Sequence, residues 1–339
     1  MHVLMVTGQL PTLTQPRSIT LAPLARQIES MRARGAQVDV LELTGIRKLK
    51  YLQCLPHLWA CAPSVDLIHA HYGYSGWIAR SQSSKPVVVS FMGDDLLGTP
   101  DSEGRVGPLS KVVVRTNRWL ARTVDAVIVK SAEMAKVLAP TKAHIIPNGV
   151  DLQTFQPMDS HRARALLGLA ENKHYILFAG NPDEPRKGFR LASAAVMNAA
   201  TRVAEPLELI PLSGVAPDRV PLYMNACYAL LMTSFLEGSP NVVKEAMACN
   251  LPVVSVPVGD VPELLAGAEG CAVCPRDAEV LAGALVNTLY GAPRTNGRAV
   301  LERKGLDQES VARRITMIYE EVLARRKAKR ASTARTTAL

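Results

Sequence analysis

The sequence predicts an α/β protein built from two open, doubly wound parallel sheets. Short apolar runs rich in Val, Ile and Leu alternate with helical patterns, which is typical of a parallel sheet covered by helices. This alternation occurs twice, and a Pro and an Asn-Gly pair between the two series, within 146–151, predict a turn or linker. The length of 339 residues suits two domains of about 100–200 residues each.

The first series accounts for residues 1–147, which we assign to an N-terminal Rossmann-like domain. Its first helix is expected over Leu21–Arg34, because Gly35 follows directly and glycine commonly ends a helix. The expected strands are Val3–Thr7, Val38–Leu43, Leu67–Ala70, Val87–Phe91, Ala126–Val129 and His144–Ile146.

The second series follows an interdomain linker at 148–158 and predicts a C-terminal Rossmann-like domain over 159–308. A further helix over 309–326 is expected to pack back toward the first domain. Residues 327–339 lack an apolar period and are expected to form a disordered basic tail. The strands are predicted over Tyr175–Ala179, Leu207–Leu212, Ala229–Thr233, Pro252–Val256 and Cys271–Cys274, and the helices over Arg190–Ala200, Asn241–Cys249, Ala278–Leu289 and Glu309–Arg326.

Composition excludes several classes of protein. Hydrophobic residues make up 48% and charged residues 20%, which is globular and not disordered composition. No run of about 18 uncharged apolar residues occurs, so no transmembrane helix is predicted. The first residues lack the basic region of a signal peptide, and the six cysteines lack zinc-like or disulfide spacing. We therefore predict a cytoplasmic protein with reduced thiols and no metal.

Charge is unevenly distributed along the chain. Residues 1–150 carry 17 basic against 10 acidic side chains, residues 151–324 carry 16 against 20, and residues 325–339 carry 6 against none. A basic first half and a basic end suit an anionic partner, either nucleic acid or an acidic membrane surface. Aromatic residues are only 5%, and no RRM, zinc-finger or helix-turn-helix pattern occurs, so nucleic acid is not the predicted partner.

The stretch 235–248 has the features of an anion-binding helix start. Ser239 is a favoured N-cap residue and Pro240 fits the first helical position. The N–H groups of Asn241 and Val242 would then be free to bind an anion at the positive end of the helix dipole.

Two glutamates flank this helix start. Glu237 lies in the loop and Glu245 lies in the helix, separated by seven residues. Both carboxylates can face one ligand, the first beside its reactive end and the second accepting hydrogen bonds from vicinal hydroxyls. On residue types alone, an ordinary amphipathic helix with two solvated glutamates explains the pattern equally well.

The Glu-x7-Glu pattern, with Gly-Ser-Pro inside and Glu-Ala-Met-Ala at its end, resembles the donor-sugar motif of glycosyltransferase family 4. Other segments agree with this resemblance in order and spacing over most of residues 1–325. They are the loop Gly180–Gly188, the linker Asn148–Asp151 with Phe155 and Pro157, and Ile68–Tyr72 at a strand end. The resemblance implies a GT-B fold, with two Rossmann-like domains facing across an interdomain cleft, and retention of anomeric configuration.

The loop Gly180–Gly188 resembles the family's phosphate-binding loop. There Lys187 is expected to neutralise the departing diphosphate, with Arg186 assisting, so that no metal is needed. The family usually carries an arginine where this chain has Asn181, which keeps a hydrogen-bond donor but loses the charge.

A second departure lies in Phe91–Leu96, which resembles the family's His-Gly-Ser-Asp-type loop near the reacting carbon. Met92 stands where the histidine is expected, leaving the backbone of Gly93 and the carboxylate of Asp94 as the candidates. The adjacent Asp94 and Asp95, without a third acid or a histidine, do not predict a metal site. His71 is a further candidate for contact with sugar or acceptor, although a structural role explains a lone histidine as well.

Two weaker signals complete the expected site. The segment containing Val215 resembles the loop that cups the nucleobase, and an ordinary turn explains it nearly as well. Gly8, in the loop after the first strand, is a weak candidate for contact with phosphate or acceptor.

Two segments interleave cations with large apolar residues, as expected for helices lying on anionic lipid. The first is Ile46–Trp59, and the second carries Lys111, Arg115, Arg118 and Arg122 beside Trp119. A solvated basic face with its apolar stripe in the core explains both slightly better on sequence alone. A peripheral location on the inner face of the membrane therefore stays open.

Together these observations predict a retaining, metal-independent glycosyltransferase. It would move a sugar from a UDP- or GDP-sugar to a glycan or lipid-linked acceptor, with Glu237, Lys187, Asp94 and His71 at the reaction centre. The overall pattern is closest to bacterial enzymes of surface-polysaccharide or teichuronic-acid-type synthesis. Two alternatives remain: a GT-B nucleotide-sugar epimerase, and a catalytically silent sugar-nucleotide binding module. Base, sugar, acceptor and oligomeric state are not readable from these residues.

Overall fold

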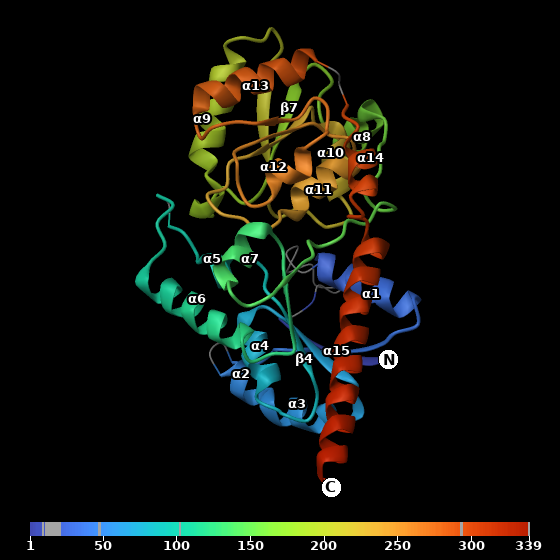
Figure 1. Ribbon diagram of the computed structural model, residues 1–339. Coiled ribbons are helices and arrows are strands. Elements are labelled where there is room, and N and C mark those ends of the chain that lie inside the picture. Colours follow the sequence, from blue (N-terminus) through green and yellow to red (C-terminus); the bar gives the residue numbers. More distant parts are fainter. Residues whose placement is uncertain (9, 11–21, 47–48, 102, 292–293, 338–339) are drawn as a thin grey trace. The chain divides into compact units, whose positions relative to one another are not determined.

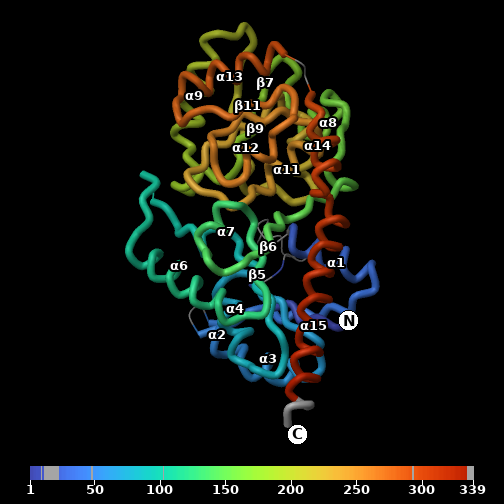
Figure 2. Tube along the Cα trace, viewed as in Figure 1, coloured from blue at the N-terminus to red at the C-terminus, as the bar shows by residue number. Residues whose placement is uncertain are grey.

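The computed structural model describes residues 1–8, 10, 22–46, 49–101, 103–291 and 294–337. The chain divides into two compact units (Figures 1 and 2). The first unit comprises Met1–Gly98, Pro108–Pro147 and Gln308–Leu339, and the second comprises Thr99–Gly107 and Asn148–Asp307.

The first unit is built on a parallel sheet whose described strands run in the order β2-β1-β3-β4-β5-β6. The central strands are buried on both faces, which is why they appear in the sequence as continuous apolar runs and not as alternating ones. Val3 of β1 pairs with Leu67 of β3, and Ile68 with Val87 of β4, so the three strands end at a common edge. The strands are β1 (His2–Thr7), β2 (Gln37–Glu42), β3 (Leu67–His71), β4 (Val87–Ser90), β5 (Ala126–Val129) and β6 (His144–Ile145).

Helices cover both faces of this sheet. Two buried clusters separate by face, one of which includes Leu58, Phe91 and Leu120, and the other Met5, Ile28 and Tyr319. The helices are α1 (Ala22–Ala33), α2 (Lys50–Gln53), α3 (Leu55–Cys61), α4 (Gly73–Arg80), α5 (Asp94–Leu97), α6 (Pro108–Ala121), α7 (Ala132–Leu138) and α15 (Gln308–Thr337), with a 3-10 turn η2 (Ala62–Ser64).

The helix α15 corrects one expectation. Residues 327–339 were predicted to be disordered, whereas the helix continues through Thr337. Ala, Lys and Arg, which are frequent here, have high helix propensity, so a polar sequence without an apolar period still extends a helix that packing has already begun. That packing comes from Ile315 and Tyr319, which are buried against α1 and the sheet.

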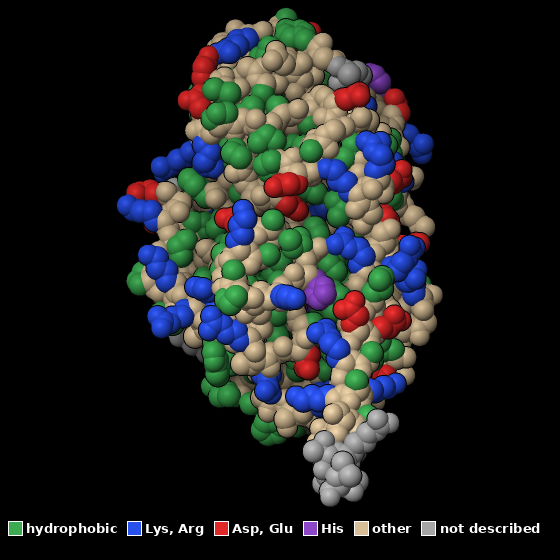
Figure 3. All heavy atoms as spheres, in the orientation of Figure 1, with side chains coloured by type: hydrophobic (Ala, Val, Ile, Leu, Met, Phe, Trp, Pro, Cys, Tyr) green, Lys and Arg blue, Asp and Glu red, His purple; other side chains and the backbone are tan. Residues whose placement is uncertain are grey.

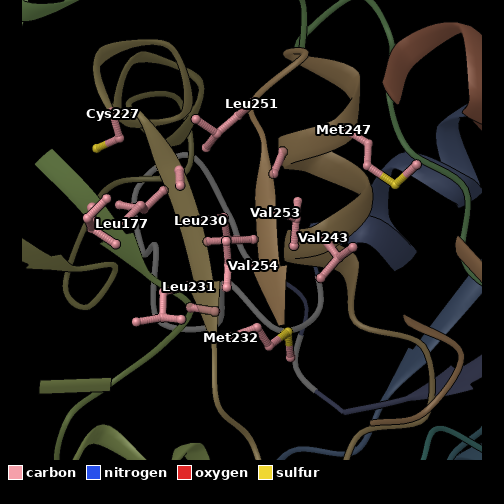
Figure 4. Packing of buried hydrophobic residues seen from close by; sticks show 14 of the residues in the cluster. Leu177, Cys227, Leu230, Leu231, Met232, Val243, Met247, Leu251, Val253 and Val254 are labelled. Atoms are coloured by element: carbon pink, nitrogen blue, oxygen red, sulfur yellow. The ribbon is translucent and has the colours of Figure 1, made fainter. Parts of the chain in front are cut away.

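The second unit holds a parallel sheet in the order β11-β10-β9-β7-β8. Figure 4 shows side chains of β9 and β10 packed beside Val243, within one buried cluster. Val243 belongs to α11, the helix that connects these two strands. The strands are β7 (His174–Phe178), β8 (Leu207–Pro211), β9 (Ala229–Met232), β10 (Val253–Ser255) and β11 (Ala272–Val273). The helices are α8 (Ser160–Leu167), α9 (Phe189–Ala200), α10 (Val220–Ala226), α11 (Asn241–Ala248), α12 (Val261–Leu265), α13 (Ala278–Tyr290) and α14 (Gly297–Arg303), with a 3-10 turn η3 (Pro185–Lys187).

The predicted strands and the predicted helices are all present, with ends shifted by one or two residues apart from the longer α15. None of the described helices is long and apolar enough to cross a bilayer. The two doubly wound sheets confirm the predicted fold class, and they place the chain's candidate site residues at the carboxyl ends of parallel strands, where open α/β sheets bind ligands.

Candidate functional site

The loop between β9 and α11 forms the centre of the candidate site in the second unit. One prediction about it was wrong: Pro240, not Ser239, is the N-cap residue, and α11 begins at Asn241 without a side-chain cap. The Ser239 hydroxyl instead accepts a hydrogen bond from Lys244 Nζ at 3.0 Å. The amide groups of the first turn, at Asn241 and Val242, therefore have no capping side chain among the described residues.

Glu237 joins this loop to the predicted phosphate loop. Lys187 Nζ donates to Glu237 Oε1 at 2.8 Å, and Arg186 NH1 lies 3.4 Å from the same oxygen. The Lys187 and Glu237 side chains are only 13% and 14% exposed. Arg186 also pairs with Glu184 at 3.1 Å. Two cations and a carboxylate, about 50 residues apart in sequence, thus meet at one point.

Backbone contacts hold the Arg186–Gly188 turn against the end of β9. The Thr233 hydroxyl proton is shared between the carbonyl oxygens of Lys187 and Gly188, at 3.0 and 3.1 Å, and the Phe235 amide donates to Arg186 O at 2.8 Å. Gly188 has a φ of +70°, and a Cβ there would lie 2.3 Å from Thr233 O. Only glycine fits at this position. The close backbone contact therefore fixes the turn that carries Arg186 and Lys187 relative to the loop that carries Glu237.

Arg276 is a residue that the sequence analysis missed. Its NH1 donates to the carbonyls of Thr233 and Ser234, at 2.8 and 2.9 Å, and its guanidinium lies 3.8 Å from the centre of the Phe235 ring. Arg276 therefore fixes the loop that leads to Glu237. No motif marks it in the sequence, because it follows β11 and comes close only through the fold.

A buried lysine and a buried aspartate beneath the loop were also missed. Lys244 is fully buried on α11, and Asp260 is 9% exposed at the start of α12. The positive charge of Lys244 and the Ser239 hydroxyl both favour the ionised form of Asp260 and so act against the effect of burial on its pKa. Burial lowers the pKa of Lys244 and raises that of Asp260, which shows that each charge is costly there.

Gly259 connects the buried Asp260 to the site. It has a φ of +55°, and a Cβ would lie 2.7 Å from Gly238 O and 2.8 Å from Glu237 O. The backbone preceding Asp260 therefore packs directly on the loop that carries Glu237. The only signal in the sequence for Lys244 is that a lysine occupies a position on the buried side of a predicted helix.

The remaining residues predicted in the second unit lie around this centre. Glu245 is half-buried on α11, one residue after the buried Lys244. Asn181 Oδ1 accepts from the Asp183 amide at 3.0 Å, which leaves its NH2 group as the donor toward a ligand. Val215 is half-buried against the core of the unit, in a loop after β8.

In the first unit, the loop after β4 is organised by Asp95. Its carboxylate accepts from the amides of Met92, Gly93 and Gly73, at 3.0 to 3.2 Å. Burial raises the pKa of Asp95 to about 7, while the amide donors act against that rise. Asp95 is thus a structural anchor. The neighbouring Asp94 is half-buried and accepts from the Tyr72 hydroxyl at 3.3 Å.

The structure buries the two histidines of β3. His69 bridges Tyr319 Oη at 2.5 Å and Ser90 Oγ at 2.8 Å, and burial lowers its pKa to about 3, so it is neutral near pH 7. His71 is 3% exposed, with Nε2 3.3 Å from Met5 Sδ. A role for His71 in contact with sugar or acceptor stays a prediction, as does that of Gly8, which lies directly after β1.

Among the described residues, no group of three or more His, Cys, Asp or Glu side chains is arranged to hold a metal ion. Ionic contacts at the site come from Lys187 and Arg186.

Family models match two stretches of the chain. Residues 33–154 match Glycosyltransferase Family 4, and residues 198–290 match Glycosyl transferases group 1. The two stretches fall in the first and second sheets respectively, and together they span more than half of the chain.

Curated relatives carry the name D-inositol 3-phosphate glycosyltransferase. The protein of Mycolicibacterium vanbaalenii is 25% identical over 282 residues, covering 70% of this chain and 62% of the relative. That of Frankia alni is 26% identical over 310 residues, covering 76% and 75%. The chain thus spans about three-fifths of the length of the Mycolicibacterium relative.

Solved structures with the same fold cover nearly the whole chain. Sucrose-phosphate synthase from Thermosynechococcus elongatus aligns with a TM-score of 0.76 at 20% identity, over 95% of this chain and 99% of that one. Anabaena Alr3699/HepE in complex with UDP-glucose aligns with a TM-score of 0.70 at 19% identity, over 95% and 100%. At these identities the likeness establishes the fold alone, which is GT-B.

Proposed function

We propose, from the premise that the chain belongs to the family 4 glycosyltransferases, that it transfers a sugar from a nucleotide-diphosphate sugar to an acceptor hydroxyl. The observation that carries the proposal is the meeting of Lys187, Arg186 and Glu237 beside the uncapped start of α11. Fixed cations and helix-start amides are suited to the charge that develops on a departing diphosphate.

In this mechanism the donor lies on the second unit. Lys187, Arg186 and the amides of Asn241 and Val242 stabilise the leaving diphosphate, so the reaction needs no metal. Glu237 positions the sugar, and Glu245 accepts hydrogen bonds from the ribose hydroxyls. The family resemblance implies a same-face displacement with retention, and we propose that mechanism here, with the leaving phosphate helping to deprotonate the acceptor hydroxyl.

The donor and acceptor classes are proposed from similarity. A structural neighbour was solved with UDP-glucose, which favours a UDP-sugar as donor. The acceptor side is assigned to the first unit, with Asp94, Gly93 and His71 as contacts. A glycan or lipid-linked acceptor of bacterial surface-polysaccharide synthesis is proposed first, and D-inositol 3-phosphate second, because curated relatives are named for it.

Thermal unfolding with nucleotides tests the donor site. UDP, GDP, ADP and CMP, with UDP- and GDP-sugars, are each added in EDTA. A ligand at 100 times its Kd stabilises the fold by about 2.7 kcal/mol, so one nucleoside diphosphate is expected to raise Tm clearly. A shift that requires Mg²⁺ contradicts metal independence, and the lack of any shift contradicts the donor site.

Product analysis then separates the three activities. Transfer that depends on an added acceptor, with the donor's anomeric configuration kept in the NMR spectrum of the product, is the expected result. Conversion of the donor without an acceptor indicates the epimerase instead. Donor binding without turnover, for both polyprenyl-linked glycans and D-inositol 3-phosphate, indicates the silent binding module.

Replacing Glu245 with alanine is expected to raise the donor KM by about 10–100-fold with little change in kcat. The physical reason is that hydrogen bonds to a carboxylate contribute about 1.5–3 kcal/mol, and the ribose contacts are made equally in the ground and transition states. Initial rates at varied donor concentration provide the measurement. The control is Glu279→Ala, which removes an exposed glutamate of α13. A fall in kcat at unchanged KM places Glu245 at the reaction centre and not at the ribose.

A further inference from the structure

Four helices of the first unit are connected side by side through α4. The ring of Tyr74 at the start of α4 lies 5.4 Å from that of Tyr51 on α2. Trp77 stacks on Trp119 of α6, with ring centres 5.1 Å apart. At the other end of α4, Ser81 Oγ accepts from the Trp59 indole of α3 at 3.2 Å. We call the outer side of α2, α3, α4 and α6 the helical face.

Large apolar side chains are exposed on the helical face. Leu109 and Trp119 of α6 are 78% and 58% exposed, and Leu52 of α2 is 63% exposed. The core side of α6 is made by other residues, Asn117 and Leu120. The exposed apolar side chains of α6 are therefore additional to those that it buries in the core. Ile46, Leu49, Trp59 and Val112 are exposed in the same way.

The helical face carries basic and no acidic side chains. Segments 46–61, 73–85 and 108–122 contain no Asp or Glu. On α6, Lys111, Arg115, Arg118 and Arg122 are all exposed, and their helical spacing puts them in a row beside Val112 and Trp119. Figure 3 shows basic and hydrophobic side chains next to each other where Figure 1 places α6.

A basic groove adjoins this face at the end of α15. Arg326 donates to Ser83 O and, at 2.6 Å, to Ser84 O, in the loop that follows the Trp59–Ser81 contact. The groove has a volume of about 680 Å³. Its acidic residue, Asp125, already accepts from the Val87 amide at 2.8 Å. The lining residues are Asp125, Val322, Arg325, Arg326, Lys329, Arg330 and Thr333.

From this geometry we propose that the helical face is a docking surface for an anionic phospholipid bilayer, and that the α15 groove, which meets the edge of this face at Ser83 and Ser84, contacts the same bilayer. The exposed apolar side chains enter the boundary between headgroups and acyl chains, while the row on α6 contacts lipid phosphates. The groove takes the phosphate of one headgroup between Arg325 and Arg330. An acidic protein partner would match the cations but would leave the outward Leu and Trp side chains uncovered, so lipid fits both properties. This proposal does not depend on the proposed reaction.

Vesicle co-sedimentation of the full chain tests the proposal. The chain is expected to sediment with vesicles of equal parts phosphatidylcholine and phosphatidylglycerol, and to stay in the supernatant with phosphatidylcholine alone. Binding is expected to weaken in about 1 M salt, where the screening length falls to about 3 Å. Failure to bind the mixed vesicles, or equal binding to both kinds, overturns the proposal.

Variants separate the two parts of the surface. Arg118→Ala with Arg122→Ala, and Arg325→Ala with Arg330→Ala, are each expected to weaken vesicle binding by about 30-fold, since one cation near an anionic membrane contributes about a factor of five. Trp119→Ser with Leu109→Ser is expected to weaken binding even in low salt. The matched control is Lys173→Ala with Arg202→Ala, two exposed cations of the second unit.

Two readouts make the variants decisive. The arginine variants should keep the wild-type Tm, because the replaced side chains are exposed, and one that loses stability is replaced by Arg→Gln at the same positions. Because Trp119→Ser also removes the stacking on Trp77, Leu109→Ser alone is measured beside the double variant. Free glycerol phosphate should compete with the vesicles only weakly if apolar insertion contributes. Full displacement by glycerol phosphate, or an equal loss of binding in the Lys173 and Arg202 control, contradicts a bilayer-docking surface.

Discussion

Replacing Lys187 with alanine is expected to lower kcat by about 10²–10³-fold, the range seen when one preorganised charge-stabilising group is removed from an active site. Lys187 is held 2.8 Å from Glu237 and is largely shielded from water, so its charge acts in a region of low dielectric. Because the diphosphate gains negative charge as the sugar leaves, the cation stabilises the transition state more than the ground state. The donor KM should therefore change little.

Rates at saturating donor, compared among variants, provide the measurement. Lys173→Ala is the matched control, since Lys173 is a lysine of the same unit paired with Glu208 on the surface at 3.0 Å. Lys187→Arg should recover part of the rate by restoring charge. If kcat of Lys187→Ala stays within about three-fold of the wild-type value, the loss is far smaller than expected. The assignment of Lys187 to the leaving group would then have no support.

Removing one partner of the Lys244–Asp260 pair is expected to destabilise the protein by about 3–5 kcal/mol, because an uncompensated charge then remains buried. Lys244→Met and Asp260→Asn should each show this loss in chemical denaturation. The double variant, which leaves neither charge, should lose clearly less than the sum of the two. Equal losses that simply add would mean that the two side chains do not interact.

The same pair predicts a pH dependence of stability. The pKa of Asp260 is raised from 3.8, so between 3.8 and the raised value the folded chain binds more protons, and stability falls as pH rises. The pKa of Lys244 is lowered from 10.5, so between the lowered value and 10.5 the unfolded chain binds more protons, and stability rises with pH. In the Lys244→Met, Asp260→Asn double variant both slopes should become smaller, and the remaining acid-side slope should be that of Asp95, whose pKa burial also raises. Slopes equal to those of the wild type would show that Asp260 and Lys244 do not contribute to the titration.

The fold was predictable because parallel strands buried on both faces leave a direct record in sequence. Runs such as Val87–Ser90 have no polar side to interrupt them, and Gly35 and Asn148-Gly149 mark the ends of elements. The end of α15 was not predictable, because periodicity identifies helices that bury a face. Beyond Arg330 this helix has no described side chain in the core.

The site was predictable where chemistry follows from local motif, and not where it follows from packing. Glu237, Lys187 and Arg186 lie in two loops at strand ends, and the structure brings them together. Ser239 was misassigned as a cap, because the buried Lys244 binds its hydroxyl. Arg276 acts by donating to backbone carbonyls, and Asp260 acts through the buried Lys244. The spacing of residues in a sequence does not reveal either contact.

The first unit closes its hydrophobic core with residues from α15, including Ile315 and Tyr319, which follow the whole second unit in the chain. On a ribosome, residues 1–147 emerge first but still lack that layer, while Asn148–Asp307 can complete its sheet as soon as it is made. At about 5–20 residues per second, the first unit waits about 10–30 s for its last helix. During that interval the nascent chain therefore exposes the apolar surface that α15 later covers. Such a surface is the kind that chaperones bind.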